Sequence, residues 1–124
     1  MTRLVLVLAS LLLLLALPIP SAWAGPVDWQ EVAATADGRQ WWDRGSLRIS
    51  RNGMLSVLSR YQPAEQDQGQ LYVMEIDCGQ RLYRDTAVNG LPRWGAPWQA
   101  VSGDGLIVAV IHDSCLAAGL QIPT

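Results

Sequence analysis

Apolar and polar residues alternate with a period of two in three segments of the chain, residues 46–50, 71–78 and 81–88. This pattern is typical of β-strands that bury one face, because successive side chains of a strand point to opposite sides. In the second segment the buried face is expected to carry four side chains: Tyr72, Met74, Ile76 and Cys78. The sequence therefore predicts a protein rich in short strands.

Turn residues indicate how two of the strands are joined. Asn52-Gly53 separates residues 46–50 from a second apolar segment, residues 54–61. Both turn residues tolerate the positive φ angles of a type I′ turn, which is the tightest connection between antiparallel strands. The sequence thus predicts a β-hairpin with a type I′ turn at Asn52-Gly53.

The segments around this hairpin are less regular. A first strand is expected within residues 27–35. Residues 62–70 contain Pro, Gly and mainly polar side chains, which predicts an exposed loop. Residues 91–98 contain two Pro and one Gly and are expected to connect elements without forming one.

The apolar segment at residues 106–111 fits two structures. Four of its six residues are β-branched, which favours a buried strand. Ser102 or Asp104, however, stands where it could cap a helix, and Gly119 follows at a suitable helix end. At helical spacing one face would carry four side chains: Val108, Ile111, Cys115 and Ala118. The pattern alone favours neither structure.

The first 24 residues have the pattern of a cleavable secretory signal peptide. Arg3 precedes an apolar run over residues 4–17, and small residues flank Trp23 at the end of the segment. The run is shorter than the ~20 residues of a transmembrane helix, so no stable membrane anchor is expected after processing. Cleavage is predicted between Ala24 and Gly25, which leaves residues 25–124 as a single domain in the periplasm, an envelope lumen or the medium. A lipid anchor is not expected, since no Cys stands at the cleavage point.

The charges of the predicted mature chain are mixed along its length. Eight Arg face eleven Asp and Glu, and the sequence has no Lys. Binding to nucleic acid or to an anionic membrane surface needs basic residues clustered on one face, and neither partner is expected here.

Both cysteines, Cys78 and Cys115, lie in the predicted exported part. An even number of cysteines in an oxidising compartment predicts one disulfide. His112 lies three residues before Cys115, so a zinc site formed with both cysteines is the competing interpretation. The disulfide is favoured, and no metal or other cofactor is expected.

Several motifs resemble those of the surface-adhesin protein E-like family. The strand 71–78 ends in Asp-Cys and is followed by Arg81 and Arg84, a Trp (Trp98) precedes the last element, and Cys115 lies near the end. The resemblance implies an α+β fold: a twisted antiparallel sheet of about six strands with a C-terminal helix tied to it by the disulfide.

The resemblance also assigns places to the cysteines. Cys78 would close the fifth strand and Cys115 would lie on the helix, which favours helix for the ambiguous last segment. The name-giving member of the family is a lipid-anchored, dimeric adhesin that binds host matrix proteins. The present chain lacks the Cys that accepts the lipid, and the adhesin's binding segments have no residue-by-residue counterpart in it, so the resemblance implies a fold and not host adhesion.

Other groupings of reactive side chains have simpler explanations than catalysis. His112, Asp113 and Ser114 are consecutive, so their side chains diverge and do not form a triad. Glu75 and Asp77 lie on the same side of a strand, where they are expected to form a solvated face opposite Arg side chains. We therefore expect no catalytic residue and no enzymatic activity.

Tryptophan is the one residue type that indicates recognition. Trp29 and Trp98 are expected to fill the core in place of Phe, which is absent. Trp41 and Trp42 are adjacent, and neighbouring strand residues point to opposite faces, so only one of them can enter a single core. The other is a candidate partner-binding residue.

These observations predict a small exported, non-enzymatic binding protein that acts through its sheet or hairpin surface. Its partner would be another protein or a second copy of the chain in a homodimer. The alternative is an accessory envelope protein that requires only stability, and a metal-binding or hydrolytic domain is the third interpretation.

Overall fold

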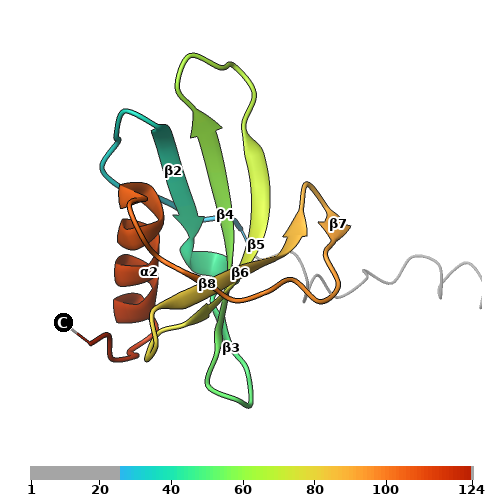
Figure 1. The fold of residues 1–124 in the computed structure, drawn as a ribbon, viewed down its shortest axis with the longest axis vertical. Helices are drawn as coiled ribbons and strands as arrows, with labels where there is room; N and C mark the ends of the chain where they lie inside the picture. Colours follow the sequence, from blue (N-terminus) through green and yellow to red (C-terminus); the bar gives the residue numbers. More distant parts are fainter. Residues whose placement is uncertain (1–25, 124) are drawn as a thin grey trace, which may run out of the picture.

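A computed structural model describes residues 26–123, which form one antiparallel sheet and one α-helix (Figure 1). The strands in chain order are β1 (Trp29–Glu31), β2 (Gly38–Asp43), β3 (Arg48–Ile49), β4 (Leu55–Pro63), β5 (Gln70–Asp77), β6 (Leu82–Val88), β7 (Leu91–Pro92) and β8 (Gln99–Ala100). The helix, α2 (Gly105–Ala117), follows them. The predicted signal peptide and its cleavage site at Ala24-Gly25 lie outside the described residues.

The strands β1, β2, β4, β5, β6 and β7 are neighbours in that order, β3 pairs with β4, and β8 pairs with β6. The sheet is strongly twisted, so that β6 crosses the lower ends of β4 and β5 at a steep angle in Figure 1. The predicted α+β class is confirmed, with an antiparallel sheet, a C-terminal helix and a disulfide between them.

Strands β2 and β3 pair with the same edge of β4, one after the other, and a short 3-10 helix, η1 (Arg44–Ser46), separates them. The Asp43 carboxylate caps η1 by accepting from the Gly45 amide at 2.9 Å. The Ser46 hydroxyl accepts from the Leu58 amide of β4 at 2.8 Å, which replaces a ladder bond lost at the interruption.

The strand predicted over residues 46–50 is shorter than expected and is not half-buried. Both residues of β3 are exposed, and Ile49 retains 54% of its surface. The β3–β4 hairpin extends past the end of α2 (Figure 1), and residues 51–53 at its tip are exposed.

The hairpin turn lies where it was predicted, but the predicted type I′ geometry is wrong. Gly53 has φ +77°, whereas Asn52 is not among the residues with positive φ. The Ser50 carbonyl accepts from Gly53 at 3.0 Å and the Ser50 amide donates to Met54 at 2.8 Å. These bonds define a three-residue loop in which the glycine alone takes the left-handed conformation.

The last apolar segment is helical, as the family resemblance implies. Asp104, and not Ser102, caps α2 by accepting from the Leu106 and Ile107 amides at 3.1 and 3.2 Å. At the other end Gly119 adopts φ +75° and the Leu120 amide donates to the Cys115 carbonyl, which is the pattern of a Schellman termination.

The core lies between α2 and one face of the sheet. The buried helical residues are Leu106, Val110, Ile111, Ser114 and Cys115. The predicted helical face was partly wrong, because Val108 and Ala118 are only half-buried. Opposite the helix, β4 and β5 contribute their buried residues: Leu55, Val57, Ser59, Met74 and Ile76. The predicted disulfide joins Cys78, directly after β5, to Cys115 on α2.

Two segments differ from the predicted boundaries. The first strand covers only Trp29–Glu31, although a bridge between Thr35 and Gly38 continues the pairing. Residues 91–98, expected to be irregular, begin with β7, and β8 follows directly after them. None of the helical structure within residues 26–123 has the length and apolar character needed to cross a bilayer.

Candidate functional site

The two faces of the sheet have different surroundings. Helix α2 packs along β2 and covers one face (Figure 1). The opposite face, which we call the open face, has no helix over it within the described chain. Antiparallel sheets commonly leave one face to solvent or to a partner.

The adjacent indoles of β2 lie on opposite faces, as strand geometry predicts. Trp42 is 3% exposed and belongs to the core, so it is excluded as a partner-binding residue. Trp41 is only half-buried and stands on the open face, directly across from Arg60 of β4 and Glu31 of β1.

Two arginines lie against the Trp41 ring. The guanidinium carbons of Arg39 and Arg60 lie 4.7 and 5.0 Å from the ring centroid. This is the distance range of cation–π attraction, which orients both guanidinium groups and the indole. The arrangement continues on β5, where Leu71 pairs with Arg60 and is 42% exposed. We call Arg39, Trp41, Arg60 and Leu71 the open-face cluster.

The two arginines of the cluster differ in their charge balance. Arg39 forms a two-pronged ion pair with Glu31, with N–O distances of 2.7 and 2.9 Å. This hydrogen-bonded pair lowers the pKa of Glu31 and raises that of Arg39. Arg60 has no acidic partner within salt-bridge distance among the described residues. The cluster therefore presents one uncompensated guanidinium next to an indole.

A second row of polar side chains crosses the same face. Arg84 of β6 donates to Glu75 of β5 at 3.1 Å, and its guanidinium carbon lies 4.3 Å from the Trp98 ring. The expectation that Glu75 faces an arginine is confirmed, whereas Asp77 accepts from the Gln80 amide in the turn that follows β5. Trp98 was expected in the core, but it is 36% exposed because it stacks on this arginine.

Sequence reasoning missed one exposed apolar feature. Leu91 on β7 and Trp94 just after it are 72% and 90% exposed. They belong to the hairpin arm that projects from β6 at the right of Figure 1. Asn89 and Gly90, both at positive φ, form its two-residue turn. An Asn-Gly pair is typical of such turns, so this pair in the sequence could have predicted the hairpin.

The residues considered for catalysis and for zinc do not come together. Both cysteines are consumed by the disulfide. His112 and Asp113 are exposed and contact each other, whereas Ser114 is fully buried and donates to the Val110 carbonyl at 2.6 Å. Among the described residues no group of three or more His, Cys, Asp or Glu is arranged to hold a metal ion.

The fold and the open face together define a small disulfide-bonded α+β domain with one covered and one aromatic, basic sheet face. The chain belongs to the surface adhesin-E family, whose model matches residues 30–121, from within β1 to beyond the end of α2. Comparisons with curated proteins and with solved structures find no match.

Family membership indicates a surface binding protein. Together with the disulfide, it indicates an exported or surface location, because disulfides persist in oxidising compartments.

Proposed function

We propose that this protein is an exported binding module that holds a protein partner against the open face of its sheet, with Trp41 at the centre of the contact. The observation that carries the proposal is the half-buried Trp41 ring in cation–π contact with Arg39 and Arg60, on a face that no helix of the described chain covers. Trp and Arg are the residue types most enriched among the energetically dominant residues of protein interfaces.

The charge of the cluster specifies the chemistry of the partner. Arg39 is neutralised by Glu31, but Arg60 is not neutralised by any described residue. A partner that places a carboxylate beside Arg60 and an apolar group over Trp41 and Leu71 would complement the face. The expected partner surface therefore combines an apolar area with an adjacent carboxylate.

The test compares Trp41→Ala with Trp94→Ala in the mature protein. Trp94 is 90% exposed and lies outside the cluster, so its substitution controls for the loss of an exposed indole. Each variant is used to capture partners from the native envelope, and captured proteins are identified by mass spectrometry. The proposal expects one acidic partner that is retained by Trp94→Ala, lost by Trp41→Ala or Arg60→Gln, and released by salt.

Sedimentation velocity of the same variants separates a foreign partner from a second copy of the chain. A dimer of the mature protein that dissociates in Trp41→Ala would assign the face to self-association. Capture of the same proteins by Trp41→Ala and by the wild type, with no change in association state, would contradict the proposal.

A further inference from the structure

A cleft of about 260 Å³ opens on the other side of the sheet, between its covered face and the first turn of α2. Its apolar floor includes Met74 and Leu106, and the rings of Tyr61 and Tyr72 line it. Asp37, Asp85 and Asp104 also line it, and no Arg or His does. The cleft thus combines aromatic walls with a concentration of negative charge.

Gln40 places an unpartnered acceptor in this cleft. Only 5% of the surface of this residue is exposed. The Ser59 hydroxyl donates to the Trp41 carbonyl at 2.9 Å, so it must accept from Gln40 Nε2, which lies 2.9 Å away. This chain of bonds fixes the amide orientation and leaves Oε1 of Gln40 without a donor from the described residues. This oxygen is not among the fully buried polar atoms, and Gln40 lines the cleft, so a donor from a ligand can reach it there.

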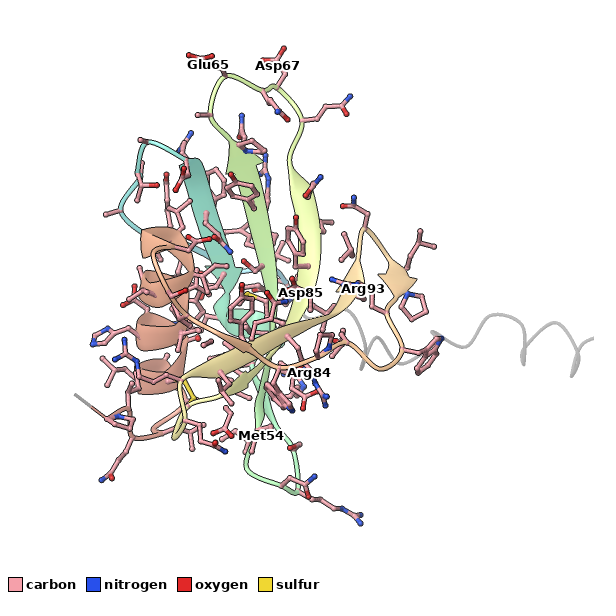
Figure 2. All side chains as sticks on the ribbon, in the orientation of Figure 1. Met54, Glu65, Asp67, Arg84, Asp85 and Arg93 are labelled. Atoms are coloured by element: carbon pink, nitrogen blue, oxygen red, sulfur yellow. A yellow bond between two sulfur atoms is a disulfide. The ribbon has the colours of Figure 1, made fainter. Side chains whose placement is uncertain are left out.

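The Asp85 carboxylate is also without a hydrogen-bond partner. It lies on the covered face of β6 directly across from Met74, whereas Arg84 points to the opposite side of the strand (Figure 2). Burial raises its pKa, and the nearby charge of Arg93 only partly offsets this effect. Arg93 does not reach salt-bridge distance. The same negative charge, added to burial, raises the pKa of the Tyr72 hydroxyl.

The remaining polar groups of the cleft add acceptors and no free donors. Asp104 uses Oδ1 to cap α2, and no described residue donates to its Oδ2. The Tyr61 hydroxyl donates to the Asp37 carbonyl and the Tyr72 hydroxyl donates to Gln70. A ligand for this cleft must therefore bring several donors and a positive charge.

We propose that this cleft binds a primary alkylammonium group of side-chain size, with the ammonium donating to Asp85 and to Oε1 of Gln40 and the alkyl chain packing between Tyr61 and Tyr72. An ammonium group has three donors and no acceptor, which matches the surplus of acceptors. Aromatic rings attract such a cation and also cover its methylene groups. The volume is smaller than the roughly 300–1,000 Å³ of pockets for drug-sized ligands, as expected for a single aliphatic chain.

A metal ion fits the same cleft poorly. Metal sites need several ligand atoms converging at about 2.0–2.6 Å from one point. The described His, Cys, Asp and Glu residues contain no such group of three. The carboxylates surround the cleft instead of meeting at one point, which suits an elongated organic cation.

Two sources can supply this chemistry, a lysine side chain of another protein or a free diamine. The test titrates the ¹⁵N-labelled mature protein with three probes, N-acetyl-lysine methylamide, 1,5-diaminopentane and the neutral analogue 1-pentanol, at fixed pH and ionic strength. Saturable shifts of the Gln40 side-chain amide and of the Leu106 and Ile107 amides are expected with at least one amine and not with the alcohol. Binding of the lysine derivative alone assigns the site to a protein side chain, and binding of the diamine alone assigns it to a free amine.

Asp85→Asn is expected to weaken amine binding about tenfold or more, because it removes a charge-assisted hydrogen bond. Asp67→Asn is the matched control, since this exposed carboxylate lies in the loop at the top of Figure 2, away from the cleft. Trp41→Ala should bind the amine as the wild type does, which separates this site from the open face. The proposal is overturned if neither amine gives saturable shifts, if 1-pentanol binds equally well, or if Asp85→Asn binds unchanged.

Discussion

Removing the disulfide between Cys78 and Cys115, and so opening the chain loop that it closes, is expected to remove a large part of the stability of this domain. The perturbation is the double substitution Cys78→Ala and Cys115→Ala. The bridged residues are 37 positions apart. The loop-closure entropy that the disulfide removes from the unfolded chain corresponds to about 4 kcal/mol at 25 °C.

Packing adds to this entropic loss. Cys78 is 4% exposed and Cys115 is fully buried, so each substitution leaves a small cavity, at about 1 kcal/mol each. Small domains have a total unfolding free energy of about 5–15 kcal/mol. Since 1 kcal/mol shifts the Tm of a domain of this size by about 4–8 °C, a decrease of about 20 °C or more is expected.

The assay is thermal and urea unfolding of the mature protein, followed by tryptophan fluorescence and far-UV circular dichroism. Wild-type protein unfolded in the presence of a reductant is the control, because reduction opens the loop without removing an atom. Its loss of stability should match that of the double variant to within the packing contribution. A double variant that melts within a few degrees of the oxidised wild type would refute the reasoning.

Three further predictions follow from the turn, the two indoles and the cleft. Gly53→Val should lower the unfolding free energy by about 1–2 kcal/mol in urea titrations, since φ is +77° there, whereas Asn52→Ala should be close to neutral. Trp42→Ala should lower the unfolding free energy by about 3–5 kcal/mol because it removes a buried core side chain. Trp41→Ala should leave a cooperative melting transition close to that of the wild type. Equal losses of unfolding free energy in the two variants would contradict the assignment of Trp41 and Trp42 to opposite faces. Burial raises the pKa of Asp85 in the folded state, so folding favours its protonated form. The stability that this carboxyl contributes is therefore fully present below its unfolded pKa and is lost as the pH rises through its folded pKa. Asp85→Asn should therefore melt at a higher temperature than the wild type at about pH 7 and at nearly the same temperature at about pH 3, and a difference that grows toward low pH would show that the sign is wrong.

Local pattern predicted the elements that carry most of the core. The alternation over residues 71–78 places Met74, Ile76 and Cys78 on the buried face, as β5 shows. The separation of Trp41 from Trp42 also followed from strand geometry alone. In these cases the information lies within a few consecutive residues.

The turns show why local pattern was insufficient elsewhere. The sequence contains Asn-Gly twice, at residues 52–53 and 89–90, and only the second pair has both residues at positive φ. The first pair lies in a three-residue loop because Ser50 pairs with Met54. Turn type thus depends on which flanking residues pair, and pairing is a property of the whole sheet.

The cleft could not have been predicted from the sequence. Asp37 precedes β2, Asp85 lies in the middle of β6, and Asp104 stands before α2. Each has an ordinary local explanation as a turn residue, a strand residue or a helix cap. Only the packing of α2 onto the sheet brings them around Gln40, whose free acceptor depends in turn on the hydroxyl of Ser59.

The disulfide also determines how the domain would respond to a pulling force. When the two chain ends are pulled apart, the loop closed by the disulfide cannot lengthen. The 37 positions between Cys78 and Cys115 correspond to about 12 nm of extended chain, and this length cannot be released while the disulfide is intact. The disulfide-closed loop contains β6, β7, β8 and most of α2. Tension applied to the chain ends can therefore extend β1 to β5 fully, whereas the elements inside the loop can separate from the sheet but cannot be extended.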